Sequence, residues 1–567
     1  MRLPVFTWLP VYDRGWLRGD LVAGLTVWAV LVPEALAYAS IAGVSPVVGL
    51  YAAPGALVLY AAFGSSRHLV VGPMAATAAL SAAAVGDLAA GGSDEFLQLT
   101  ITMGLVVGIL ALGAGLCRLG FLASFISEPV LKGFIIGLAL TIIVGQLPKL
   151  FGVPKGDGDF FEQLWDFLSA LDATSGLTLL IGLVSLALVL GLKEYAPVVP
   201  GSLVVVGIGI VAVQLFDLDE HGVEIVGNIE SGLPAVGLPD VSVSDYLDIA
   251  PAAVGVMLIG FAEGLGAAKT YAARRHYEID ANRELIGLGT ANLGAGLSSG
   301  MVVNGSLSKT AVNASAGASS QLSGLVVATL TIVTLLFLTG LFEDLPEATL
   351  AAIVIAALVE LVDVPALVRL YRFHTRGAGR ALSVAARPDF VAALATLLGV
   401  LLFDTLPGLF IGVVVSILLL VYRASRPHVA LLGKVPGTRT QWSDVERHPE
   451  NEPVDGIVVL RPESGLWFAN ADMVRDTVRA HAAGDTRAVV LDAETVPAID
   501  VTALAMLVQL ADDLRRDGVE LVLARDIGAI RDLVNVGGDE RALRSYLTVQ
   551  AAVDDLTKGA IDGPGDR

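Results

Sequence analysis

Two stretches of this sequence carry the same unusual pair of features. In each, a carboxylate stands inside an apolar run and is followed some forty residues later by a short polar helix start. The first pairs Glu34 with Gly-Pro-Met-Ala-Ala-Thr at 72–77, and the second pairs Glu263 with Gly-Ser-Leu-Ser-Lys-Thr at 305–310. A helix that begins inside a membrane presents unpaired N–H groups and the positive end of its dipole, which favour an anion. Paired interrupted segments of this kind predict a binding site at mid-membrane.

Polar side chains at these starts could bind the same anion. Ser306, Ser308 and Thr310 offer hydroxyl donors at the second start, and Thr77 lies near the first. Lys309 adds a fixed positive charge, which is rare and costly within a span. The alternative is that the hydroxyls only cap a helix and that Lys309 extends to the interface. Because two starts occur at equivalent places, we favour the binding site.

The carboxylates Glu34 and Glu263 would repel an anion if both stayed ionised beside it. A proton or a cation such as Na⁺ would resolve this conflict, and either would make the protein a coupled carrier. In an alternative reading, Glu263 pairs permanently with Lys309 as a structural ion pair. Glu34 has no cation near it in the sequence and is therefore the better candidate for proton coupling.

Composition separates a membrane region from a soluble one. The chain has 567 residues, of which 54% are hydrophobic and 16% charged, whereas a soluble protein carries about 25% charged residues. The predicted domains are a cytoplasmic N-terminal segment (1–19), a transmembrane domain (20–426), a linker (427–453), a soluble α/β domain (454–553) and a flexible acidic tail (554–567).

Several functional classes are disfavoured by what the sequence holds. A net charge of −20 argues against nucleic-acid binding. The lone Cys117 excludes an intramolecular disulfide and a Cys-rich metal site. We find no Walker-type loop, no catalytic constellation and no metal-ligand cluster, so we expect neither an enzyme nor an ATP-driven pump, and no cofactor beyond a coupling ion.

Apolar runs interrupted by Gly, Pro or charged residues predict a polytopic α-helical membrane protein with fourteen spans. The third and tenth are too short to cross as ordinary helices. The predicted spans are 20–40, 46–63, 70–85, 96–116, 121–144, 174–192, 200–216, 249–268, 282–298, 306–318, 322–341, 346–364, 388–404 and 406–423.

The distribution of charge orients these spans. Connections after even-numbered spans carry Lys and Arg, whereas the long odd-numbered connection 217–248 holds eight Asp or Glu residues and no Lys or Arg. The positive-inside rule then places both termini in the cytoplasm of a multi-pass cell-membrane protein. Seven spans in each half would insert the second copy upside down, as an inverted repeat requires.

The C-terminal region alternates buried strands with helices and predicts an α/β sandwich. The predicted strands are 454–461, 487–493 and 519–525, and the predicted helices are 470–482, 500–516 and 527–536.

Four segments together resemble the sulfate permease (SulP) family of anion transporters with a C-terminal STAS domain. They are GDLVAGLTVWAVLVPEALAYASIAGVSPVVGLYAA (19–53), SEPVLKGFIIGLA (127–139), EIDANRELIGLGTANLGAGLSSG (278–300) and, for the STAS domain, VVLDAETVPAIDVTALAML (489–507).

This resemblance implies a seven-plus-seven inverted repeat with a core domain (spans 1–4 and 8–11) and a gate domain (spans 5–7 and 12–14). It also implies elevator-like movement of the core, a homodimer, and substrates such as sulfate, bicarbonate, chloride or dicarboxylates. The anion site that it implies is formed by Ala75, Ala76 and Thr77, by Ser306, Ser308, Lys309 and Thr310, and by Glu34, Ala35 and Tyr38 of the first span.

In related STAS domains the start of the helix after the central strand can carry a phosphorylated Ser or Thr, and Thr502 matches that position. A phosphate there would meet a helix N-terminus. The simpler interpretation is that Asp500 or Thr502 caps the helix. The cytoplasmic protein partner of this domain is not identified by the sequence.

Together these features predict a proton-coupled secondary carrier of small inorganic anions, foremost sulfate or a similar oxyanion. The alternatives are a sodium-coupled bicarbonate symporter, a dicarboxylate or anion exchanger, a passive anion channel and a non-transporting membrane sensor.

Overall fold

The computed structural model describes residues 5–125, 127–156, 158–196, 199–359, 362–375, 379–403, 405–526 and 543–561. The chain forms two compact units, Met1–Ser416 and Ile417–Arg567, and the boundary falls inside the last long apolar helix.

The first unit is mainly helical and contains two short strands. Within the described residues, seven helices are long and apolar enough to cross a membrane, and five shorter apolar helices accompany them. The helices are α1 (Leu17–Ile41), α2 (Pro46–Phe63), α3 (Ala75–Gly86), α4 (Asp94–Leu116), α5 (Glu128–Phe151), α6 (Phe160–Ser169), α7 (Gly176–Tyr195), α8 (Gly201–Phe216), α9 (Val243–Arg274), α10 (Ala281–Leu297), α11 (Leu307–Ser315), α12 (Leu322–Phe337), α13 (Glu347–Val359), α14 (Val364–Thr375), α15 (Gly379–Phe403) and α16 (Thr405–Ser425).

Each of the fourteen predicted spans contains one of these helices, which is consistent with the predicted count. The fifth begins later than predicted. Residues Gly120–Phe125 form a separate 3₁₀ helix, and α5 starts at Glu128 with a proline in its first turn, where the missing N–H costs nothing. The short helices α6 and α14 lie between predicted spans and were not anticipated.

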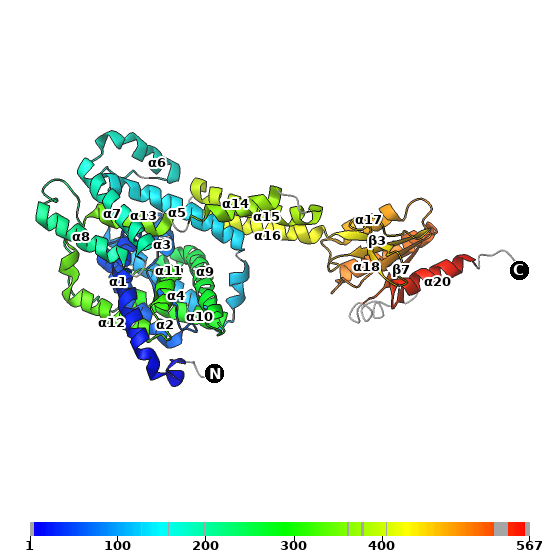
Figure 1. The fold of residues 1–567 in the computed structure, drawn as a ribbon, viewed down its shortest axis with the longest axis horizontal. Helices are drawn as coiled ribbons and strands as arrows, with labels where there is room; N and C mark the ends of the chain where they lie inside the picture. Colours follow the sequence, from blue (N-terminus) through cyan, green and yellow to red (C-terminus); the bar gives the residue numbers. More distant parts are fainter. Residues whose placement is uncertain are drawn as a thin grey trace. The chain divides into compact units, whose positions relative to one another are not determined.

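The helices of the first unit fall into two packed groups. One group joins α1–α4 to α9–α12, with α10 against α2 and α4, and α12 against α1 and α2. The other joins α5, α7, α8, α13 and α15, and there α5, α14 and α15 run side by side (Figure 1). The first group corresponds to the core domain that the family resemblance implies, and the second to spans 5–7, 12 and 13 of the implied gate domain.

An inverted repeat is visible where the two short spans begin. Strand β1 (Val70–Gly72) precedes α3, and strand β2 (Asn304–Ser306) precedes α11. The strands pair antiparallel, with Val70 opposite Ser306 and Gly72 opposite Asn304. Because each strand leads directly into its helix, this ladder sets the two helix starts beside each other.

Close packing in the first group depends on small residues. A Cβ atom added at Gly49 of α2 would lie 2.0 Å from the carbonyl oxygen of Ala35 on α1. Gly55 and Gly294 are similarly close, since each one's added Cβ would lie within 3 Å of the other's carbonyl oxygen. Small residues let helix backbones approach in this way inside a membrane.

The second unit is built around a six-stranded sheet with the order β4-β3-β5-β6-β7-β8. Strand β3 is antiparallel to β4 and β5, and β5, β6, β7 and β8 are parallel. The strands are β3 (Val429–Lys434), β4 (Trp442–Asp444), β5 (Ile457–Pro462), β6 (Ala488–Asp492), β7 (Glu520–Ala524) and β8 (Arg544–Tyr546).

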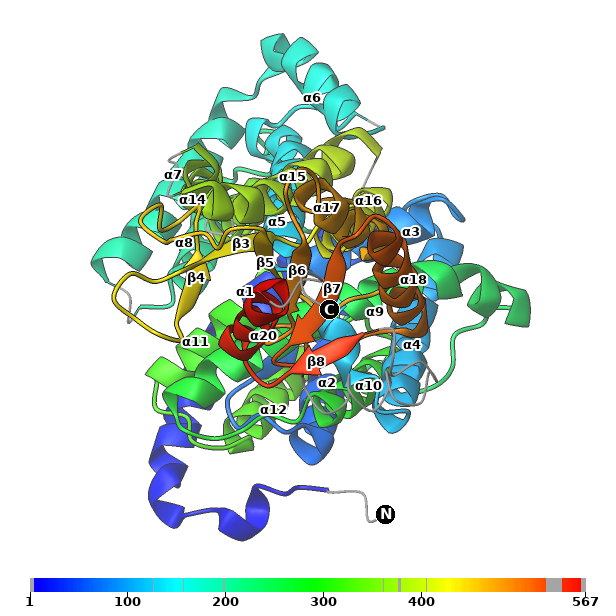
Figure 2. The same ribbon diagram turned by 90° about the vertical axis from the view of Figure 1, so that its right-hand side faces the viewer.

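Helices cover both faces of this sheet. Helices α17 (Ala471–His481) and α18 (Val501–Arg516) pack with one face, and α20 (Val549–Ile561) packs with the other (Figure 2). The two faces carry separate apolar cores, so the sheet is buried on both sides, as parallel strands require.

Three of the predicted strands and two of the predicted helices are confirmed as β5, β6, β7, α17 and α18. The described soluble unit extends on both sides of the predicted domain 454–553. The predicted linker 427–453 contains β3 and β4, because Ala430 and Leu432 alternate into the core beside β5. The predicted tail 554–567 begins inside α20, whose Val549, Ala552 and Val553 share one face against the sheet. The predicted helix 527–536 lies outside the described residues.

We predict that Gly49→Ala lowers the thermal stability of the purified protein by about 1–3 kcal/mol, the usual cost of inserting a methyl group where backbones touch. The matched control is Gly113→Ala on α4, where an added Cβ meets nothing within 4 Å. That change should leave stability unaltered or slightly higher, since Ala favours a helix more than Gly. Fluorescence-detected unfolding in detergent measures both, and equal melting temperatures would contradict the close contact between α1 and α2.

Candidate anion site

The two helix starts lie together but differ in how their first-turn N–H groups are satisfied. At α11, the Ser306 hydroxyl accepts a hydrogen bond from Lys309 N at 3.2 Å. At α3, the residue before the helix is Met74, which supplies no side-chain cap. The first turn of α3 therefore keeps backbone donors at Ala75, Ala76 and Thr77 that no N-cap side chain satisfies, which is the arrangement that receives an anion.

Lys309 places a positive charge between these starts. Its side chain is 1% exposed, and its Nζ lies 2.7 Å from Glu34 Oε2. The same ammonium donates to the Pro73 carbonyl at 3.1 Å and lies 5.0 Å from the centroid of the Tyr38 ring. The lysine thus joins α11 to α1 and to the turn before α3, and Tyr38 adds a cation–π contact.

This geometry corrects the alternative in which Glu263 pairs with Lys309. The partner is Glu34, because α1 packs against α11 and carries its carboxylate to the ammonium. No cation stands near Glu34 along the chain, since Glu34 and Lys309 belong to different halves of the sequence.

The ion pair between Lys309 and Glu34 is not fully satisfied. Glu34 Oε2 is buried and makes the ion contact, but no described residue gives it a hydrogen bond of normal geometry. A buried pair whose remaining hydrogen bonds are incomplete recovers little of its desolvation cost.

Glu263 of α9 lies beside β2. Its Oε2 accepts from Asn304 Nδ2 at 3.4 Å, and α9 packs along this strand. Asn292 fixes the backbone of Val303, the residue before Asn304. Its side-chain amide donates to Val303 O and accepts from Val303 N, each at 3.0 Å. Glu263 is thus linked to the site through the strand and not through the ammonium.

The remaining predicted site residues fall into two groups. Thr77 and Thr310 serve the fold, because Thr77 donates to Met74 O and Thr310 Oγ1 accepts from Val70 N at 3.1 Å. Ser308 is exposed and shares a 3.2 Å hydrogen bond with Ser306. Ala35, Ala75 and Ala76 are buried and contribute small side chains and backbone atoms.

Polar residues after the second helix start hold the first one in place, and sequence reasoning missed them. Asn313 Nδ2 donates to His68 O at 2.9 Å, and Gln321 Nε2 donates to Ser66 O and Leu69 O, each at 2.9 Å. Both side chains are buried. The spacing in the sequence could have indicated Asn313, since it stands one helical turn after Lys309 on the same face of the helix.

In the second unit, Asp500 caps α18 by accepting from Ala503 N at 2.8 Å and also accepts from Phe468 N at 2.7 Å. The capping interpretation is therefore confirmed for Asp500. Thr502 is exposed in the first turn, and its phosphorylation stays a prediction. Within the described part of the chain, no three His, Cys, Asp or Glu side chains gather to hold a metal ion.

An inverted helical repeat with two interrupted spans meeting at a buried cation is the architecture of a secondary transporter. The profile of the Sulfate permease family matches residues 17–381, and that of the STAS domain matches residues 448–552. The chain belongs to the sulfate permease family and carries a C-terminal STAS domain. Members of this family are anion transporters, and this chain is one.

Similar proteins cover most of the chain. A probable sulfate transporter of Mycobacterium tuberculosis (strain CDC 1551 / Oshkosh) is 39% identical over 91% of this chain and 90% of its own length. High affinity sulfate transporter 1 of Stylosanthes hamata is 30% identical over 92% of this chain and 80% of its own length.

Two solved structures share the fold. The murine anion transporter named solute carrier 26 family member A9, in its inward-facing state, has a TM-score of 0.88 at 23% identity and covers 98% of this chain and 94% of its own. The transmembrane domain of a cyanobacterial bicarbonate transporter has a TM-score of 0.60 at 22% identity and covers 72% and 98%.

We predict that Lys309→Met destabilises the protein by about 3–5 kcal/mol, because it leaves the Glu34 carboxylate buried without its partner. The double variant Lys309→Met/Glu34→Gln should recover most of that loss, since neither buried charge remains. Thermal unfolding in detergent, measured for both variants and for Glu34→Gln alone, gives the coupling energy. Additive effects of the two substitutions would show that the ion pair does not form.

Proposed function

We propose that this protein is a proton-coupled carrier of small inorganic anions, foremost sulfate, that works by alternating access. The observation that carries the proposal is the buried ion pair between Lys309 and Glu34 at the start of two half-helices.

The proposal follows from charge balance around a single buried ammonium. Without substrate, Glu34 neutralises Lys309 at 2.7 Å. An anion that approaches the open N–H groups of α3 competes for the same ammonium. Once it binds there, Glu34 is left as an unpaired buried carboxylate, a state that costs several kcal/mol. Uptake of one proton by Glu34 removes this cost, so anion and proton bind together.

Substrate choice rests on the site's donors and on the relatives. The Lys309 ammonium and the backbone N–H groups of α3 are donors only, which suits an oxyanion with several acceptor oxygens. The relatives described above are named sulfate transporters. Sulfate is therefore the first substrate that we propose.

Movement is proposed to occur between the two helix groups of the first unit. The ion pair and both helix starts belong to the group of α1–α4 and α9–α12, so the site can travel as one piece. The facing group, which includes α5 and α13, would remain still during this elevator-like step. We further propose a homodimer and a cytoplasmic protein partner for the STAS domain, as the family resemblance implies.

Sodium coupling is a second candidate, favoured by Glu263. Its carboxylate lies beside the amide of Asn304 on β2, and carboxylate and amide oxygens are ligands that hard cations accept. Na⁺ there would bring positive charge to the strand that leads into α11.

Uptake of radiolabelled sulfate into proteoliposomes tests the proposal, with the membrane potential clamped at zero. We expect an inward gradient of one pH unit to raise accumulation about tenfold for one proton per anion, because one unit is equivalent to about 1.4 kcal/mol. Replacing sodium by choline should have no effect. Glu34→Gln should lose the dependence on the pH gradient, since its side chain cannot take up the proton.

Glu263→Gln is the matched control for this experiment, because it removes a carboxylate that contacts Asn304, whereas Lys309 pairs with Glu34. It should keep the response to pH. Proton dependence that persists in Glu34→Gln would reject the coupling role, and uptake that fails in choline and in Glu263→Gln would establish sodium coupling. Sulfate uptake that survives Lys309→Met/Glu34→Gln would show that the anion binds elsewhere.

A separate prediction concerns Thr502. Because its side chain is exposed in the first turn of α18, a kinase can reach it, and the added phosphate would meet a helix N-terminus. Mass spectrometry of the protein purified from its native cells should find a phosphorylated fraction, which Thr502→Ala removes. Peptides covering 489–516 that are never modified would contradict the prediction.

A further inference from the structure

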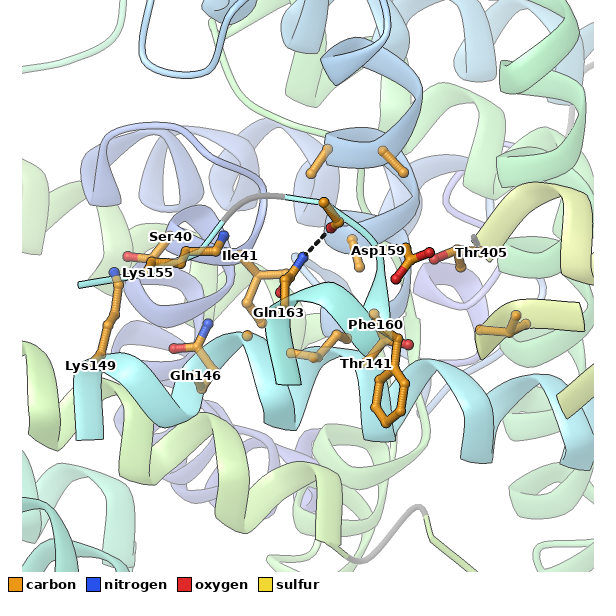
Figure 3. Close-up of a pocket in the computed structure, with 17 residues that line it drawn as sticks. Ser40, Ile41, Thr141, Gln146, Lys149, Lys155, Asp159, Phe160, Gln163 and Thr405 are labelled. Carbon is orange, nitrogen blue, oxygen red and sulfur yellow. Dashed lines mark hydrogen bonds between the residues drawn. The ribbon is translucent and has the colours of Figure 1, made fainter. Parts of the chain in front are cut away.

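A second polar space lies between the two helix groups, away from the ion pair. It is a cavity of about 340 Å³, within the size range of small-molecule sites. Its walls come from the end of α1, the second half of α3, the end of α5, the start of α6, and α15 and α16. Figure 3 shows its lining side chains.

The strongest feature of this cavity is Gln146 of α5. Its side chain is only 7% exposed, and it makes no hydrogen bond to any described residue. The amide lines the cavity among the other polar side chains (Figure 3). The amide is accessible from the cavity, so a ligand held there can accept its hydrogen bonds.

Two ammonium groups share the end of the cavity where Gln146 lies. Lys149 follows Gln146 by one helical turn, and Lys155 comes from the loop after α5 (Figure 3). Lys149 also pairs with Glu347 at 2.9 Å. Among the described residues of the cavity wall, the carboxylate belongs to Asp159, which lies at the opposite end beside Thr405 (Figure 3). This carboxylate accepts hydrogen bonds from Phe161 N and Glu162 N of α6.

These donors specify a ligand. The ammonium groups of Lys149 and Lys155 and the amide N–H₂ group of Gln146 can donate hydrogen bonds into the same end of the cavity. The carboxylate of Asp159, at the far end, accepts hydrogen bonds from the first turn of α6. A small anion such as sulfate has several acceptor oxygens and can accept hydrogen bonds from all three groups.

The cavity also borders the two helices, α1 and α3, that lead away from the ion pair. Ala79 of α3 stands one turn beyond Ala75, and Ser40 of α1 lies about half a turn beyond Tyr38. Both helices leave the ion pair toward the side that the charge pattern assigns to the cell exterior. The cavity therefore faces the outer end of the site, between the group that carries the anion and the group that includes α5.

We propose that this cavity is a second anion site, a waiting position on the extracellular side, where Gln146, Lys149 and Lys155 hold a small anion before it reaches Lys309. The inference rests on the proposed transport function, since it gives the anion a route to the central site. It assigns an entry role to residues of α5 and of the loop that follows.

Protection of a cysteine by sulfate tests this site directly. The single Cys117 is changed to Ser, and Ala83→Cys introduces a thiol at the cavity wall. A membrane-impermeant thiosulfonate reagent then modifies right-side-out vesicles with and without sulfate. We expect sulfate to slow modification, also when Lys309→Met/Glu34→Gln has removed the central site.

Substitutions in the cavity should weaken this protection. With Gln146→Leu or Lys155→Gln, the half-protecting sulfate concentration should rise about tenfold, as expected for one lost hydrogen bond to a charged group. The matched control is Lys132→Gln, which removes a lysine of α5 that pairs with Glu128 at 2.7 Å and does not line the cavity. That variant should leave protection unchanged.

The proposal is overturned if protection disappears in the Lys309→Met/Glu34→Gln background, because sulfate would then act only through the central site. It is also overturned if protection survives both Gln146→Leu and Lys155→Gln. Neither result affects the transport proposal, which stands or falls on sulfate uptake by the variants of Lys309 and Glu34.

Discussion

A single buried ammonium constrains the whole membrane unit. Lys309 is almost completely enclosed, and an unneutralised charge in such a place costs several kcal/mol. The protein therefore has to bring a carboxylate, a carbonyl and an aromatic face to one point from elements distant in sequence. Glu34 and Tyr38 come from α1 and Pro73 from the turn before α3. In the function that we propose, an anion that neutralises the lysine must replace this carboxylate.

The short antiparallel ladder of β1 and β2 makes this convergence possible. Pairing of the two strands gives hydrogen bonds to backbone N–H and C=O groups that would otherwise lack partners within the membrane. Irregular backbone is tolerated there only in the protein interior. Glycine and alanine let the surrounding helices come close enough to seal it, as at Gly49 against Ala35. The side-chain amides of Asn313 and Gln321 then donate hydrogen bonds to backbone carbonyl groups of the residues just before β1. The result is a rigid frame around a weakly satisfied ion pair.

The soluble unit reaches its fold by different means. Its parallel strands are buried on both faces by α17 and α18 on one side and α20 on the other. Asp492, fully buried at the end of β6, is held by the guanidinium of Arg525, which also pairs with Glu494 at 2.7 Å. A complete bidentate pair of this kind fixes the strand ends. It contrasts with the pair at Lys309, where the hydrogen bonding is incomplete and exchange of partners is possible.

Local patterns determined much of this protein from the sequence alone. Hydropathy located the helices, the repeated polar starts located α3 and α11, and apolar runs located β5, β6 and β7, because each of these signals lies within a few residues. Strands β3 and β4 were not predicted from the sequence, because their apolar patterns are short. Helix α20 was also not predicted, because acidic residues obscure its apolar face. The pairing of Lys309 with Glu34, the unpartnered amide of Gln146 and the cavity beside it depended on the tertiary structure. Such contacts are set by how helices from opposite halves of the chain cross, and no local pattern of residues records that crossing.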